Sequence, residues 1–278
     1  MIQSFYWPML LAALLAFGVA KFILNSILQL IIEAGFVRPN FRGDNIPVGA
    51  GLLFFVSVLP PTVLFLILQS DSVHLEGLIF LFAICAMTLL GMVDDIFGSR
   101  AATGLKGHIK KMLQGELTTG GLKLLAGGLI SLAVAVVVSH GWQQVMVNTL
   151  VIALSINAIN LLDLRPGRAG KGFLLGAVLL FLGGWPSQQL CWLAVMVGAL
   201  LAYLPYDLKA KAMMGDTGSN ALGATIGITA AMVLPETAKL GYLVFLIAFH
   251  LLTEKYSLTK IIEKNKMLNY LDQLGRNQ

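Results

Sequence analysis

One carboxylate in the sequence lies between glycines at the start of an apolar segment. Residues 213–220 read Met-Met-Gly-Asp-Thr-Gly-Ser-Asn, so Asp216 follows Gly215 and precedes Thr217. A charge at the edge of an apolar segment is costly unless it binds a partner, and glycine lets backbone N–H groups approach a ligand closely. The pattern indicates a divalent cation on Asp216, with phosphate contacts from Thr217 and the neighbouring amides. Taken alone, the stretch fits a helix N-cap equally well.

A second acidic motif, the pair Asp94 and Asp95, follows the apolar run 77–93. Adjacent carboxylates raise each other's pKa unless a cation neutralises them, and acids are unfavourable at a helix C-terminus. A solvated helix end is therefore the weaker interpretation, and we predict a functional pair.

Polar residues also line the end of the run 145–162. Asn157, Asn160 and Asp163 are three residues apart, which places them on one helix face. Polar residues aligned on one side of a membrane helix face a partner or a site rather than lipid. Arg165 and Arg168 are also three residues apart, across a Pro-Gly break. They could hold a diphosphate, pair with nearby acids, or simply flank a membrane segment.

The segment 104–123 combines Lys, His and Thr with repeated Gly, and it includes Lys111. Such a composition could form a phosphate cradle, although the Gly-Lys-Ser/Thr ending of a Walker loop is absent. A basic segment that touches lipid headgroups explains it equally well.

These groups need apolar elements to position them. Of the 278 residues, 57% are hydrophobic and 12% are charged, against about 25% charged in soluble domains. We predict an all-α membrane bundle of about nine transmembrane helices, because lipid forbids unpaired backbone groups. The apolar runs are 7–32, 48–68, 77–93, 122–138, 145–162, 172–185, 190–204, 221–233 and 242–252.

Basic residues set the expected orientation. Sixteen of the nineteen Lys and Arg residues follow odd-numbered runs, so these runs should end in the cytoplasm. We expect a multi-pass plasma-membrane protein with its N-terminus outside and its C-terminus and site cytoplasmic. Residues 1–252 would form the bundle. Residues 253–278 have the spacing of an amphipathic helix on the membrane or over the cytoplasmic face. The net charge of +5 fits lipid headgroups, and no motif indicates nucleic acid.

Four motifs together resemble the polyprenyl-phosphate N-acetylhexosamine-1-phosphate transferase family (glycosyltransferase family 4). Its members include phospho-MurNAc-pentapeptide translocases and GlcNAc-1-phosphate transferases. The matching stretches are Ile-Pro-Val-Gly-Ala-Gly at 46–51, Val-Asp-Asp at 93–95, Asn-Ala-Ile-Asn-Leu-Leu-Asp at 157–163, and Met-Gly-Asp-Thr-Gly-Ser at 214–219.

The resemblance implies transfer of a sugar-1-phosphate from a nucleotide-diphosphate sugar, with a UDP-sugar the first choice, to a polyprenyl phosphate in the membrane. It implies Mg²⁺ (or Mn²⁺) on the diphosphate, for cell-wall or surface-polymer synthesis such as that of peptidoglycan. By the resemblance, Asp216 is the main metal ligand. Asp94 and Asp95 position or deprotonate the lipid phosphate and assist the metal. Asn160 and Asp163 contact the nucleotide and diphosphate.

The chain also departs from the family pattern. Gly98 stands where a third acid is usual, residues 164–167 read Leu-Arg-Pro-Gly, and the translocase's histidine cluster is absent. These departures leave open a second hypothesis, a non-catalytic relative that binds polyprenyl phosphate or nucleotide sugar as a regulator or scaffold. They also leave open the substrate sugar, and the sequence does not decide for or against a homodimer.

Overall fold

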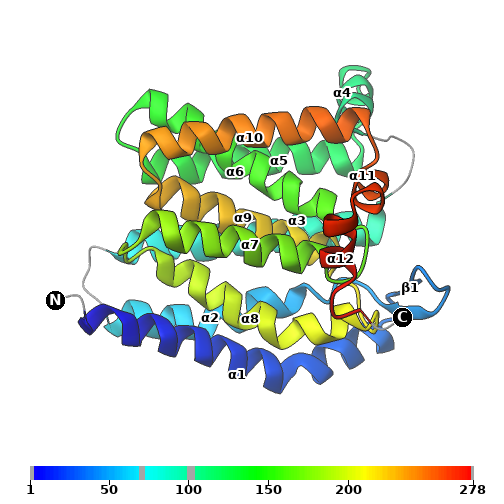
Figure 1. Cartoon of the computed structure of the whole chain (residues 1–278), viewed down its shortest axis with the longest axis horizontal. Helices are drawn as coiled ribbons and strands as arrows, with labels where there is room; N and C mark the ends of the chain where they lie inside the picture. Colours follow the sequence, from blue (N-terminus) through cyan, green and yellow to red (C-terminus); the bar gives the residue numbers. More distant parts are fainter. Residues whose placement is uncertain (1–2, 69–72, 99–103, 277–278) are drawn as a thin grey trace.

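The structure is a computed structural model that describes residues 3–68, 73–98 and 104–276 of the chain. It is a helical bundle (Figure 1) with one short two-stranded sheet. In chain order the elements are α1 (Gln3–Glu33), β1 (Val37–Pro39), β2 (Asn45–Pro47), α2 (Leu52–Leu68), α3 (His74–Phe97), α4 (Gly104–Leu113), α5 (Thr119–Val138), α6 (Trp142–Leu162), α7 (Arg168–Gly184), α8 (Leu190–Leu208), α9 (Gly215–Val233), α10 (Glu236–Lys255), α11 (Leu258–Lys264) and α12 (Lys266–Gln273).

Each of the nine predicted apolar runs lies largely within a helix of its own, which confirms an all-α membrane bundle. Among the described residues, six helices are long and apolar enough to cross a membrane, namely α1, α3, α5, α6, α8 and α10. Helix α2 is apolar but shorter, and α9 carries polar residues in its first two turns. The count of nine spans stays a prediction.

Helix α9 lies at the centre of the bundle and packs against α2, α3, α5, α6, α7 and α8. Every residue from Thr217 to Ala231 is buried, as expected for a helix that neighbours cover on all sides. Gly223 and Gly227 face the backbone of α6 at Ile156 and Ile152, where a Cβ would not fit. This close contact fixes α9, and with it the first turn that carries Asp216.

The β1–β2 hairpin is the departure from an all-helical fold. Its strands pair antiparallel, with Arg38 opposite Ile46. The residues that follow run beside the segment before α9, since Ala50 N–H donates to the Met213 carbonyl (3.0 Å) and Met213 N–H to the Pro47 carbonyl (2.9 Å). Residues 46–51, one of the four matching motifs, therefore hold the entrance to α9.

The C-terminal segment forms two short helices, α11 and α12, rather than the single amphipathic helix predicted for 253–278. The helix is interrupted at Asn265. The Asn265 side chain accepts hydrogen bonds from Met267 N–H and Leu268 N–H, both at 3.1 Å, and so caps α12. Helix α10 continues to Lys255, beyond the predicted boundary at 252. Helix α12, the hairpin, α4 and the first turns of α7 and α9 gather at one end of the bundle (Figure 1).

Candidate active site

Asp94 and Asp216, from the two acidic motifs, meet at the ammonium group of Lys123. The Lys123 Nζ atom lies 3.1 Å from Asp94 Oδ2 and also forms an ion pair with Asp216 Oδ2. Asp94 lies in the last turn of α3, Asp216 in the first turn of α9 and Lys123 in the first turns of α5, so three helices contribute one charge each. All three side chains are partly buried. The two carboxylates thus lie on either side of one ammonium group.

A close crossing of α3 and α9 produces this meeting. Gly91 lies one turn before Asp95, and a Cβ there would clash with the backbone of Asp216 and Thr217. Glycine therefore lets the end of α3 touch the first turn of α9. The separation of Asp94 from Asp216 is set by backbone packing.

Asp95 points to the backbone of α9. Its Oδ1 accepts a hydrogen bond from Asp216 N–H (2.9 Å), while its Oδ2 accepts from Thr217 N–H (2.9 Å) and Thr217 Oγ1–H (2.6 Å). The carboxylate thus caps a helix N-terminus from another helix. Gly215 leaves room for it, with a positive φ of 68° and no space for a Cβ beside Asp95. Thr217 is buried by this contact.

The amide row of α6 reaches the same turn of α9. Asn160 Nδ2 donates to Ser219 Oγ (3.1 Å) and to Asn220 Oδ1 (3.3 Å). Asn157, one turn earlier, lines the adjoining cavity. The two amides therefore face the site, as their spacing predicted.

Two cavities share Asp94. The first, of about 890 Å³, extends from Lys123 and Asn160 between α5, α6 and α10, along apolar residues that include Leu124, Leu154, Ile247 and Leu251. The second, of about 630 Å³, lies towards the hairpin, the residues after α6 and the turn before α9. The first is mainly apolar and the second is rich in charge.

The second cavity holds five carboxylates facing two guanidinium groups. The acids are Asp94, Asp95, Asp163, Asp207 and Asp216, and the bases are Arg38 and Arg165. The Arg165 guanidinium lies over the Phe41 ring, 5.7 Å from its centroid, in a cation–π contact. Burial, and then the negative charges of Asp207 and Asp216, raise the pKa of Asp163 well above its ordinary value. This excess of negative charge favours a cation in the cavity.

Comparison with known protein families gives a match over the part of the chain that contains both acidic motifs. The family model of glycosyl transferase family 4 matches residues 77–234, more than half of the chain. The chain belongs to glycosyl transferase family 4. The matched range contains both acidic motifs and Lys123, which confirms the resemblance drawn from the motifs.

Individual relatives are moderately similar to this family 4 chain. The phospho-N-acetylmuramoyl-pentapeptide-transferase of Clostridium botulinum (strain Eklund 17B / Type B) is 28% identical over 210 residues, covering 71% of the chain and 62% of the relative. Those of Wolbachia pipientis wMel and Halalkalibacterium halodurans are each 28% identical, covering 69% and 75% of the chain and 61% and 67% of the relative. The chain thus spans about three fifths of the length of the Clostridium and Wolbachia relatives.

Three predicted substrate residues do not line either cavity, namely Thr217, Arg168 and Lys111. Thr217 is fully buried and hydrogen-bonded to Asp95. Arg168 is only 5% exposed and pairs with Asp272 of α12 through Nε and Oδ1, 2.8 Å apart. Lys111 on α4 pairs with Glu116 at 2.9 Å. Of the alternatives for Arg168, pairing with an acid is the one observed.

The family 4 site also contains residues that the sequence analysis did not name individually, although Lys123 and His108 belong to the segment 104–123. Lys123 joins the two aspartates, and its signal was a lone charge at the start of an apolar run. His108 lines the first cavity, with Nδ1 2.8 Å from Thr118 Oγ1. Asp207 is 4% exposed and accepts a hydrogen bond from Gly167 N–H at 3.0 Å. An acid near the end of an apolar helix was its signal.

The residues present fit a divalent cation. No group of three His, Cys, Asp or Glu side chains has metal-binding geometry within 3–68, 73–98 and 104–276. However, Mg²⁺ is commonly held by one or two carboxylates together with substrate phosphates and water. Asp94 and Asp216 supply two carboxylates, and an ammonium group already bridges them. A cation between them is therefore electrostatically favourable.

Proposed function

We propose that the chain transfers a sugar-1-phosphate, of the N-acetylhexosamine type, from a UDP-sugar to a polyprenyl phosphate for cell-wall or surface-polymer synthesis. The observation that carries the proposal is the pair of cavities that share Asp94, one apolar and one charged. A reaction between a lipid and a soluble anion needs both surfaces next to the same reactive group. The family membership and the relatives' printed names support this reaction class.

The first cavity suits the lipid phosphate. Its apolar wall along α5, α6 and α10 can cover an isoprenoid chain. Lys123 and His108 at its polar end can contact the phosphate, with Thr119 and Asn160 beside them. The lipid's phosphate would then lie next to Asp94.

The second cavity suits the nucleotide sugar. Arg38 and Arg165 can bind phosphate oxygens, and Phe41 offers an aromatic surface. The carboxylates Asp94, Asp163 and Asp216 would repel a diphosphate unless a cation stands between them. Mg²⁺ (or Mn²⁺), bound by Asp216 and Asp94, would supply that charge and neutralise phosphate oxygens.

In the proposed reaction, an oxygen of the polyprenyl phosphate forms a bond to the phosphorus that carries the sugar. The bond from that phosphorus to the bridging oxygen breaks, and UMP leaves with the electron pair. Asp94 lies where it can orient the attacking phosphate or accept its proton. Lys123 can stabilise negative charge on either phosphate, and Asp95 holds the α9 turn that carries Asp216. The site would face the cytoplasm, with the N-terminus of the chain outside.

The test uses purified protein, Mg²⁺, undecaprenyl phosphate and a panel of radiolabelled UDP-sugars, followed by extraction of the lipid phase. We expect label in the lipid phase and release of UMP. Asp216→Asn and Asp94→Asn should each lower the rate by at least about a hundredfold, the scale for removing one electrostatic stabiliser of a transition state. Chelation by EDTA should also stop transfer.

Glu263→Gln is the matched control, because it neutralises an exposed carboxylate on α11. It should transfer at the rate of the unaltered protein. Full activity in both aspartate variants would contradict the mechanism. Binding of UDP-sugar or undecaprenyl phosphate without transfer from any donor would instead identify a non-catalytic binding protein.

A further inference from the structure

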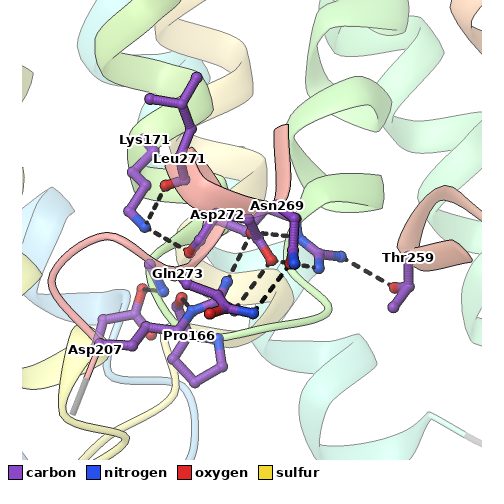
Figure 2. A network of polar contacts seen from close by, with 11 residues as sticks. Pro166, Lys171, Asp207, Thr259, Asn269, Leu271, Asp272 and Gln273 are labelled. Carbon is purple, nitrogen blue, oxygen red and sulfur yellow. Dashed lines mark hydrogen bonds and ion pairs between the residues drawn. The ribbon is translucent and has the colours of Figure 1, made fainter. Parts of the chain in front are cut away.

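The carboxylate of Asp272 on α12 lies between two guanidinium groups (Figure 2). It accepts two hydrogen bonds from Arg168, at 2.8 and 2.9 Å, and two from Arg276, at 2.7 and 3.0 Å. Arg168 Nη1 also donates to Thr259 Oγ1 of α11 at 3.1 Å. Asp272 is 9% exposed and Arg168 is 5% exposed. The contact therefore joins both tail helices, α11 and α12, to the first residue of α7.

This cluster is held in its ionised form. Burial alone would raise the pKa of Asp272, but the hydrogen bonds from Arg168 and Arg276 outweigh it and keep that pKa below its ordinary value. Removing one member of a buried ion pair leaves an uncompensated charge, which is strongly destabilising. The cluster should therefore be sensitive to loss of the Asp272 charge.

The same network reaches the wall of the second cavity. Arg276 Nε donates to the Pro166 carbonyl at 2.6 Å, and Pro166 lines that cavity together with Arg165. Lys171 Nζ donates to the carbonyls of Leu271 (2.9 Å) and Asp272 (2.6 Å). The loop between α6 and α7, residues 163–167, is thus hydrogen-bonded at Pro166 to Arg276, which also binds Asp272 of α12.

Their other side is fixed by α8. Gly167 N–H donates to Asp207 Oδ2 at 3.0 Å, which Figure 2 shows beside the tail contacts. Gly167 has a positive φ of 74°, so the chain turns sharply there before α7 begins. The loop 163–167 carries Asp163 and Arg165, both of which line the second cavity. Its conformation decides where these two side chains lie.

We propose that Asp272 is a positioning residue for the nucleotide-sugar end of the site. Through Arg168 and Arg276 it holds the loop 163–167 in the conformation that presents Asp163 and Arg165 to the second cavity. The identity of the affected substrate rests on the proposed function, whereas the effect on the loop does not. The tail helices lie outside residues 77–234, the range that matches the family model, so the family assignment does not account for this contact.

The first measurement is hydrogen exchange, which needs no turnover. In Asp272→Asn we expect the backbone N–H groups of residues 163–165, 167 and 168, Gly167 above all, to exchange about tenfold faster or more than in the unaltered protein. Arg276→Ala should have a smaller effect in the same direction, because it removes the donor to Pro166 but leaves the Arg168–Asp272 pair. Glu263→Gln is again the matched control, and the Asp272→Glu variant should restore part of the protection.

The second measurement is the steady-state kinetics of the same variants. The KM for UDP-sugar should rise about tenfold, while the KM for undecaprenyl phosphate stays within about twofold. Unchanged exchange at 163–168 in both folded variants would overturn the proposal, and so would an equal rise of both KM values. If the unaltered protein transfers no sugar, the proposed function fails. The exchange result then decides about Asp272 by itself.

Discussion

The two cavities that share Asp94 differ in what their walls can recognise. The first is bounded by helices that could cross a membrane, and an apolar wall of this kind binds through the area it covers. The second is bounded by the hairpin, the loop 163–167 and the turn before α9, and it holds five carboxylates. A charged wall binds a ligand through the arrangement of its charges, and an excess of carboxylates favours a cation that compensates their negative charge. One bundle thus offers an apolar and an ionic binding surface on either side of one carboxylate.

Among variants that distinguish the roles of the two cavities, the largest effect on KM is expected from filling the first cavity. A Cβ on Gly128 of α5 meets no atom within 4 Å, and Gly128 lines that cavity. Gly128→Leu should raise the KM for undecaprenyl phosphate about tenfold, or ~1.4 kcal/mol, with the KM for UDP-sugar unchanged. Gly18→Leu on α1 is the matched control, since Gly18 also has open space around it. An increase confined to UDP-sugar would reverse our assignment of the cavities.

A somewhat smaller effect should follow from removing a charge from the second cavity. Arg165→Ala should raise the KM for UDP-sugar about fivefold, because a partly exposed charged contact contributes ~1 kcal/mol. The KM for undecaprenyl phosphate should not change. Lys211→Ala, which removes an exposed basic residue before α9, is the control for general loss of positive charge. Equal effects of the two variants would show that Arg165 acts only through long-range charge.

The smallest expected effect concerns stability and pH. Because the pKa of Asp163 is raised in the folded protein, its ionised form is destabilising at neutral pH. Asp163→Asn should therefore raise Tm at pH 7.5 without divalent cations, by a few degrees for each ~1 kcal/mol. The difference should shrink as pH falls through the raised pKa, and disappear near the ordinary value of 3.8.

Thermal unfolding in detergent, followed by circular dichroism between pH 4 and 8, measures this difference. Asp44→Asn in the exposed hairpin serves as its control. A lower Tm for Asp163→Asn at pH 7.5 would show that Asp163 is stabilised by a partner and is not strained by burial.

Much of this arrangement could be predicted from the sequence, because membrane helices can be recognised by their length and apolar composition. The apolar runs predicted the positions of the helices. The polar residues at the ends of these runs, Asp94, Asp216 and Asn160, line the two cavities. Adjacent residues on a helix point about 100° apart, so Asp94 and Asp95 had to face different neighbours. Which of them would face α9 depends on the crossing at Gly91, and periodicity does not report such a crossing.

The sequence also could not predict which groups the basic residues contact in the folded protein. Lys123 looks like a charge flanking a membrane segment, yet it bridges two carboxylates from α3 and α9. Arg165 and Arg168 look equivalent by spacing. The turn at Gly167 sends Arg165 to the second cavity and Arg168 to a carboxylate in α12. These partners lie far away in sequence, where local patterns carry no information.

The Arg168–Asp272 contact has a consequence for the order of assembly. It joins residues 104 positions apart, and four helices lie between them in the chain, namely α8, α9, α10 and α11. Long-range contacts of this kind form late, since the chain entropy of closing the loop must be overcome first. The carboxylate turn of α9 can therefore be in place while the wall at 163–167 is still loose. In a partly folded chain, Asp216 could therefore lie beside Asp94 before Asp163 and Arg165 are held at the second cavity.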